Sequence, residues 1–147
     1  MKQLKRIVSS AALVGVALSL PAQTLKDKSG MEADRKQMMD SQKSVNSTCG
    51  TSIQVKVDYD SYIKGAGSVD EYSHAPYQYC QNATEALEQT CRNSSAGKQA
   101  VQQKVKALSC SYGATQGVSL DGSTLHYTVG YHGGNADFVV KWLGDHL

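Results

Sequence analysis

The chain lacks the short motifs by which many small enzymes are recognised. No serine stands in a G-x-S-x-G arrangement, and no motif ties any of the four histidines to a nucleophile. The carboxylates of "DYDS" at 58–61 lack the third oxygen donor, the glycine and the bidentate glutamate of a calcium loop. The sequence therefore points to no catalytic residue, no metal site and no cofactor.

The chain also lacks a basic run that could neutralise many phosphates. Its 15 basic residues stand against 13 acidic ones. Residues 1–22 hold three of the basic residues and none of the acidic ones, which leaves 12 against 13 and a net charge of −1 for the remainder. The sequence therefore lacks the basic patch that nucleic-acid-binding proteins usually have, and we expect no nucleic acid partner.

Long apolar stretches are scarce as well. Ile7–Leu20 is uncharged and apolar but falls short of the roughly 20 residues of a comfortable membrane span. It follows Lys2, Lys5 and Arg6 and precedes an acceptable cleavage site at Ala22. This layout predicts a secretory signal peptide over 1–22, with a retained N-terminal anchor as the alternative. We expect a bacterial protein that is periplasmic or secreted and has no membrane span once the signal is removed.

The four cysteines form no C-x-x-C pair, which argues against a redox motif or a zinc site. In an exported chain they predict structural disulfides instead. Cys80 and Cys91 fall on one predicted helix, about 16 Å apart along its axis at about 1.5 Å per residue. A disulfide needs Cα atoms about 4.4–6.8 Å apart, so these two cannot bond each other. Two pairings remain: Cys49–Cys91 with Cys80–Cys110, which chain direction favours, or Cys49–Cys80 with Cys91–Cys110.

The expected domain begins at the first cysteine. Residues 23–48 are polar and charged, and we predict a mobile leader segment there. A pair between Glu32 and Lys36 at i,i+4 leaves a short frayed helix as the alternative. Residues 49–147 then form a single disulfide-stabilised domain.

Residue patterns within 49–147 predict an α+β fold. Alternation in "SIQVKVDY" indicates a half-buried strand from Ser52, followed by a loop over 60–75. Pro76 opens a helix through Asn93, a second short helix follows, and "ALSCSY" is typical of a strand. The expected architecture is a small mixed sheet of about four strands, packed with a disulfide-bonded helix and a C-terminal helix.

Two more elements complete this expectation. Asp121-Gly122 is a two-residue hairpin turn, which would pair Leu120 with Ser123 and Val118 with Leu125. "NADFVVKWLGDHL" predicts a closing helix capped by Asn135. Its expected apolar stripe is Phe138, Val139, Trp142 and Leu143.

Tyrosine placement is the most unusual feature of the sequence. Five of the eight tyrosines fall within 59–79, around the expected loop. Tyrosine offers a large contact area and a hydroxyl at low entropy cost, so it is enriched in binding surfaces. We predict an exposed partner-binding patch of Tyr62, Ile63, Tyr72 and Tyr77; the alternative is rings packed on the sheet edge.

Other candidate groups are weaker. His126 and His132 lie about 20 Å apart along a continuous strand at about 3.3 Å per residue, too far to share one ion. Glu85 and Glu88 stand one turn apart on the predicted helix, without a cleft to make them a catalytic pair.

The sequence thus favours an exported, non-enzymatic binding protein of the bacterial envelope, which recognises a protein or an envelope polymer. An inhibitor or immunity-type role fits its size by analogy alone. The first alternative is a small secreted hydrolase with carboxylate or histidine chemistry. A third possibility is a purely structural envelope component, which would associate with itself and have no distinct partner.

Overall fold

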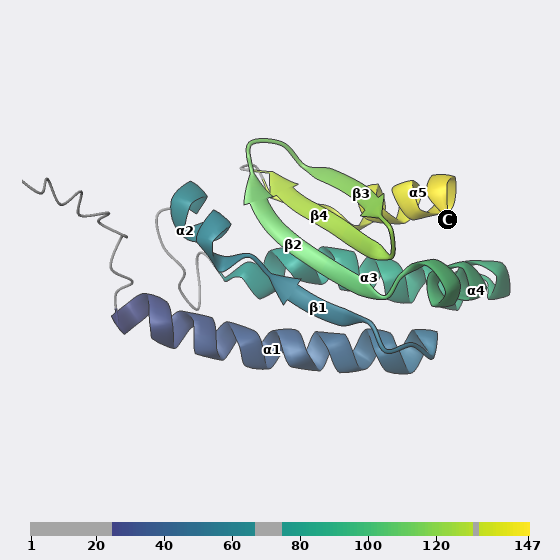
Figure 1. Ribbon diagram of the computed structural model, residues 1–147, viewed down its shortest axis with the longest axis horizontal. Coiled ribbons are helices and arrows are strands. Elements are labelled where there is room, and N and C mark those ends of the chain that lie inside the picture. Colours follow the sequence, from purple (N-terminus) through teal and green to yellow (C-terminus); the bar gives the residue numbers. More distant parts are fainter. Residues whose placement is uncertain (1–24, 67–74, 131–132) are drawn as a thin grey trace, which may run out of the picture.

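The structure, a computed structural model, describes residues 25–66, 75–130 and 133–147 (Figure 1). The predicted signal peptide, residues 1–22, lies outside these ranges. The described residues form five helices and one mixed sheet, so the predicted α+β class is confirmed. In chain order the elements are α1 (Leu25–Cys49), β1 (Gln54–Val57), α2 (Tyr59–Ala66), α3 (Pro76–Asn93), α4 (Ser95–Lys104), β2 (Ala107–Gly113), β3 (Gly117–Asp121), β4 (Thr124–Gly130) and α5 (Ala136–His146).

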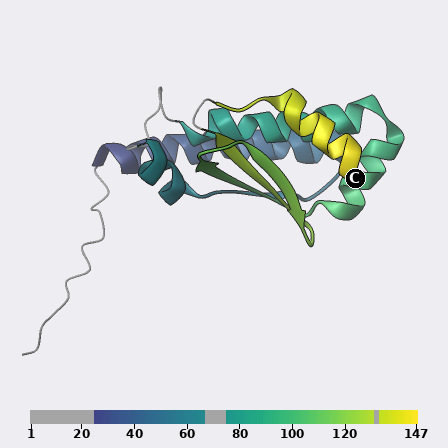
Figure 2. The same cartoon turned by 90° about the horizontal axis from the view of Figure 1, so that it is seen from above.

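The sheet has the strand order β1-β2-β4-β3. β2 lies parallel to both β1 and β4, and β3 closes the far edge antiparallel to β4. Figure 2 shows α1, α3 and α5 on one face of this sheet, and in the described part of the chain no helix covers the other. The sheet therefore has one buried face and two edges, β1 and β3.

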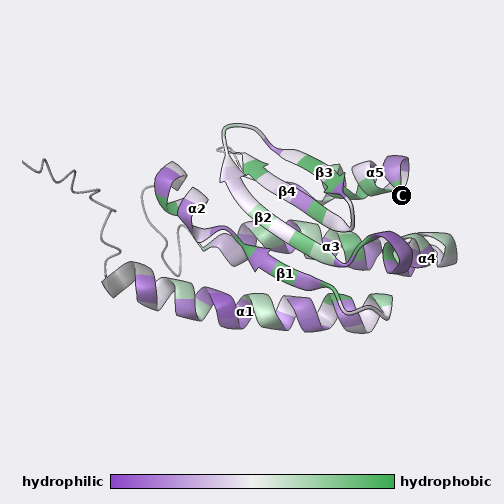
Figure 3. Cartoon of the chain, viewed as in Figure 1, coloured by the Kyte–Doolittle hydropathy of each residue, from purple (hydrophilic) through white to green (hydrophobic). Residues whose placement is uncertain are grey.

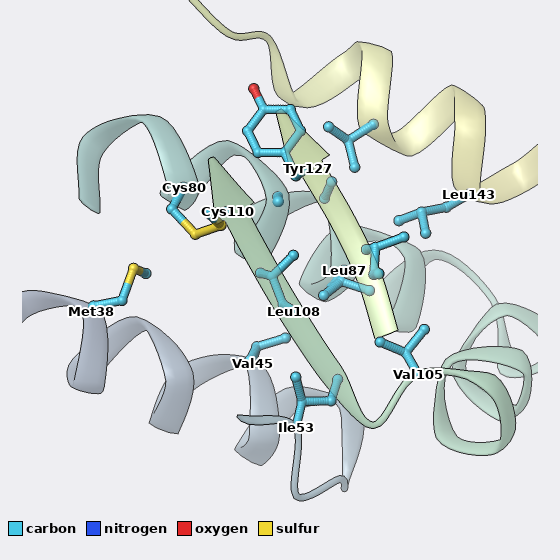
Figure 4. Packing of buried hydrophobic residues seen from close by; sticks show 14 of the residues in the cluster. Met38, Val45, Ile53, Cys80, Leu87, Val105, Leu108, Cys110, Tyr127 and Leu143 are labelled. Atoms are coloured by element: carbon cyan, nitrogen blue, oxygen red, sulfur yellow. A yellow bond between two sulfur atoms is a disulfide. The ribbon is translucent and has the colours of Figure 1, made fainter. Parts of the chain in front are cut away.

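α3 lies at the centre of the helical layer and begins at Pro76, as predicted. Pro76 occupies the first turn, where the missing amide costs nothing. Ala83 and Leu87 face inward with no exposed surface, and they meet Leu108 of β2 and Tyr127 of β4 in one core. Figure 4 shows this packing, with Leu143 of α5 closing one side.

The prediction of a mobile leader at 23–48 is wrong from Leu25 onward, because these residues form α1 and pack against α3. Most of α1 is hydrophilic (Figure 3), which is why its composition resembles that of a disordered segment. Met31, Met38 and Val45 are nevertheless buried, and they recur every seven residues. That spacing puts one narrow apolar stripe against the core.

The loop expected at 60–75 begins with a helix instead. α2 starts at Tyr59, so this tyrosine leaves the strand to which its alternation assigned it. Asp58 caps the helix: its Oδ1 accepts the amide of Ser61 at 3.2 Å, and the Ser61 hydroxyl donates to the Asp58 carbonyl at 2.7 Å. The "DYDS" carboxylate at 58 is therefore a helix cap.

The hairpin is present, but its register differs from the prediction by two residues. Leu120 lies opposite Leu125, and Val118 lies opposite Tyr127. The loop is Gly122-Ser123 rather than Asp121-Gly122, and Gly122 has a φ of +56°. A glycine at the first loop position suits a type II′ turn. Because the shift is two residues, the same side chains still face the core.

Two disulfides tie α3 to its neighbours. Cys49–Cys91 joins the last residue of α1 to α3, and Cys80–Cys110 joins α3 to β2. Their Cα atoms lie 5.4 and 5.7 Å apart. Of the two pairings left by the sequence, this is the favoured one. The sequence predicts that both disulfides join this helix to the sheet. Cys91, near the C-terminal end of α3, is instead bonded to Cys49 of α1.

α5 closes the fold with the predicted cap. The Asn135 side chain accepts the amide of Asp137 at 2.7 Å. Val139 and Leu143 are buried, whereas Phe138 is 43% exposed. Phe138 therefore lies outside the buried stripe that the sequence predicted.

Candidate functional site

The predicted tyrosine patch does not form in the described residues. Tyr62 has no exposed surface, so its assignment to an exposed patch is wrong. Ile63 and Tyr77 are half-buried against the core. Tyr72 lies outside the described residues.

Tyr62 belongs to a packed cluster of three rings. Its ring centroid lies 5.3 Å from that of Tyr112 and 6.3 Å from that of Tyr79. The helical phase of α2 turns Tyr62 inward, and Gly65 lets Tyr112 approach, since a Cβ there would lie 2.4 Å from a carbon of that ring. Burial raises the pKa of the Tyr62 phenol, whose oxygen has no hydrogen-bond partner among the described residues. These rings therefore build the core.

A groove of about 510 Å³ lies between α1 and the edge strand β1. One wall is a single face of α1, because its members recur at i, i+3, i+4 and i+7. The other wall is the outer edge of β1, the edge away from β2, together with the start of α2. The lining residues of this edge groove are Arg35, Met38, Met39, Gln42, Val55, Lys56, Val57 and Tyr59.

The backbone of β1 contributes polar groups to the edge groove. Gln54 and Asp58 donate their amides to carbonyls on the β2 side, at 3.1 and 2.9 Å. Alternate residues of a strand direct their backbone groups to opposite sides. Val55 and Val57 therefore direct theirs away from β2, toward the groove.

Side chains of α1 occupy only part of this edge. Asn46 accepts the Ile53 amide at 2.7 Å and donates to the Ile53 carbonyl at 3.0 Å. Gln42 accepts the Val55 amide at 2.7 Å. The carbonyl of Val55 and the amide of Val57 have no such partner among the described residues. Among residues 25–66, 75–130 and 133–147, the edge is therefore closed at one end of β1 and open at the other.

The charged residues that line the edge groove are both cations. Arg35 and Lys56 are exposed at its rim. The Arg35 guanidinium lies 5.3 Å from the centroid of the Tyr59 ring, a cation–π contact that holds it beside the groove. The groove thus combines apolar walls, two backbone groups and two positive charges.

Asp34 is the buried carboxyl of α1, with 3% of its surface exposed. Its oxygens accept hydrogen bonds from the Tyr59 hydroxyl at 2.8 Å and the Tyr77 amide at 2.7 Å. Desolvation raises the pKa of the Asp34 carboxyl, although the two hydrogen bonds and Arg35 oppose the shift. The same burial, and the nearby Asp34, raise the pKa of the Tyr59 phenol. Asp34 joins α1, α2 and α3 and is turned away from solvent.

The other candidate groups are not brought together. Glu85 is exposed, but Glu88 is 9% exposed and bonded to Arg92, because α1 covers that face of α3. His126 is exposed on the uncovered face of the sheet, and His132 lies outside the described residues. Within the described ranges, no three His, Cys, Asp or Glu side chains are grouped as a metal site would require.

Comparisons with family models, with curated proteins and with solved structures find no match to this chain. Among the helices that the structure describes, none combines the length and apolar character needed to cross a membrane.

The sequence reasoning missed the α1 wall of the edge groove. The seven-residue recurrence of Met31, Met38 and Val45 was the available signal for a packed helix. The spacing of Arg35, Met38, Met39 and Gln42 was the signal for a second face. The β1 wall follows from the sequence, because the alternation in "SIQVKV" predicts this strand.

Proposed function

We propose that this chain is an exported, non-enzymatic binding protein that holds an extended segment of a partner protein in the edge groove. The observation that carries the proposal is the half-closed edge of β1 beside an apolar groove. An extended peptide can add to such an edge by main-chain hydrogen bonds, while shallow pockets receive its alternate side chains.

The backbone groups of β1 that lack a partner among the described residues suit such pairing. The Val55 carbonyl and the Val57 amide are successive outward groups on one strand edge. A single residue of a parallel peptide strand could donate to the first and accept from the second. This favours a protein partner over an envelope polymer, because a polymer of another chemistry lacks matching backbone groups.

The walls supply the apolar contact. Met38, Val55 and Val57 line the groove, and Met39 is 58% exposed at its rim. Methionine adapts to differently shaped partners because its side chain is flexible and polarizable. A volume of about 510 Å³ lies within the range of ordinary ligand sites, about 300–1,000 Å³.

The two disulfides are consistent with an extracellular or periplasmic location. Export is part of the proposal, and an inhibitor or immunity-type role is one form that it could take. The hydrolase alternative gains no support from Asp34, since this carboxyl is buried and both of its oxygens accept hydrogen bonds.

The test uses the oxidised protein and blocked heptapeptides that alternate valine with glutamine. We expect measurable binding by calorimetry, and loss of binding when the amide of the central peptide residue is methylated. Met39→Ser should weaken binding about tenfold, since burying a methionine is worth about 1.5–3 kcal/mol and part of that is lost.

Phe138→Ser is the matched control, because Phe138 is also an exposed large apolar residue but lies on α5, away from the groove. It should bind as the parent does. The proposal fails if no peptide binds, if methylation has no effect, or if both variants lose binding equally.

A further inference from the structure

We infer that the segment held in the edge groove is acidic, with carboxylate side chains beside Arg35 and Lys56. This inference rests on the proposed function and adds the chemistry of the partner. Charge makes the groove selective, because the apolar walls and backbone groups alone would accept any extended segment.

The lining of the edge groove carries two cations and no acidic side chain. Arg35 reaches it from α1, and Lys56 reaches it from β1, so the charges stand on opposite walls. Lys56 alternates with Val55 and Val57 and therefore stands on the uncovered side of the sheet. A segment lying between the walls would pass both cations.

Two acidic groups line the hollow that adjoins the edge groove at the end near α2. Asp58 and Asp60 border a shallower hollow at the start of α2, which shares Arg35 and Val57 with the edge groove. Asp34, next to Arg35 in sequence, is buried and hydrogen-bonded. The positive character is thus greatest along the stretch beside Lys56 and weakest near Asp58.

The opposite side of α1 has the opposite charge. A polar hollow of about 650 Å³ between α1 and α3 is lined by Asp40, Glu85 and Glu88, with Arg92 as its cation. An acidic segment would be repelled there and attracted into the edge groove. α1 therefore separates a positively charged surface from a negatively charged one. Such a difference in charge disfavours binding of an acidic segment at the wrong surface.

The test compares three blocked heptapeptides that alternate valine with glutamate, glutamine or lysine. Each exposed ion pair is worth roughly 1.5- to 5-fold in an equilibrium constant. With two cations, we expect the glutamate peptide to bind the oxidised protein about 5- to 10-fold more tightly than the glutamine peptide at low salt. The lysine peptide should bind most weakly, and added salt should narrow the differences.

An Arg35→Gln/Lys56→Gln variant should lose the preference for glutamate over glutamine, so the ratio of the two affinities, measured within this variant, should approach one. Lys141→Gln is the control, because Lys141 is a 78% exposed cation on α5, outside the groove. This control should keep the preference.

Three results would overturn the inference: equal binding of the three peptides, tightest binding of the lysine peptide, or a glutamate preference that survives in the double variant. Each leaves the groove itself as a peptide site. Failure of every peptide to bind the parent protein would instead overturn the proposed function.

Discussion

At the scale of single residues, Asn46 forms hydrogen bonds that hold both the end of α1 and the residues leading into β1. Its side chain accepts from the Thr51 hydroxyl at 2.8 Å and bonds both backbone groups of Ile53. Its own carbonyl accepts the amides of Gly50 and Thr51. Nothing in "VNSTCGTSI" marks Asn46 for this role, because its partners are set by the direction in which β1 leaves the turn.

Asp34 gives a pH-dependent prediction. Because burial raises its pKa in the folded state above the ordinary value of 3.8, the folded protein binds this proton more tightly than the unfolded chain. Its contribution to stability is complete below that value and is lost as the pH rises through the folded pKa. We expect the free energy of unfolding, parent minus Asp34→Asn, to fall as the pH is raised through this window.

Urea titrations at a series of pH values would measure this difference. Tyr59→Phe should make the total fall larger and extend it to higher pH, because it removes a hydrogen bond that stabilises the Asp34 carboxylate and so raises the folded-state pKa of Asp34 further. A difference between parent and Asp34→Asn that is independent of pH would contradict the prediction.

At the scale of elements, the sequence predicted best where a local pattern and its partner lie close together. α3, α5 and the hairpin were predicted, because a proline, a cap residue and a glycine turn each act within a few residues. α1 and α2 were not, because tertiary contacts make them helical. The hydrophilic α1 is held by one narrow stripe, by side-chain bonds to β1 and by Cys49–Cys91.

Two adjacent methionines test how firmly α1 is packed. Met38 points into the core (Figure 4) and is 5% exposed. Met39 is 58% exposed. Met38→Ala should lower the free energy of unfolding by about 2–5 kcal/mol. Met39→Ala should change it by less than about 0.5 kcal/mol. Guanidinium unfolding would measure the change in free energy for both variants. Equally small effects of the two substitutions would contradict the packing of α1 and favour a mobile segment there.

At the scale of the whole molecule, the two disulfides close loops with separations of 42 and 30 residues. On the chain-entropy model each is worth about 3.5–4 kcal/mol. Together they approach the total stability of an ordinary domain, about 5–15 kcal/mol. We therefore expect the redox state of the surroundings to decide whether this chain folds.

We predict that Cys49→Ala/Cys91→Ala and Cys80→Ala/Cys110→Ala each fold with stability lowered by about 3–4 kcal/mol. Loss of both bridges should leave a largely unfolded chain at room temperature. Near-ultraviolet circular dichroism and amide exchange would follow the loss of packing, with mass spectrometry to count free thiols. A fully reduced chain with native exchange protection would be the opposing result.

The half-closed edge of β1 also bears on self-assembly. A long free strand edge invites another copy to add its own strand, and repetition of that step builds a fibre. Here Asn46 and Gln42 already occupy the outward groups of Ile53 and the outward amide of Val55, so a neighbouring copy would find only a short remainder. We therefore expect that such a short stretch of unpaired edge could still bind the proposed peptide but would offer too few hydrogen bonds to hold successive copies in a fibre.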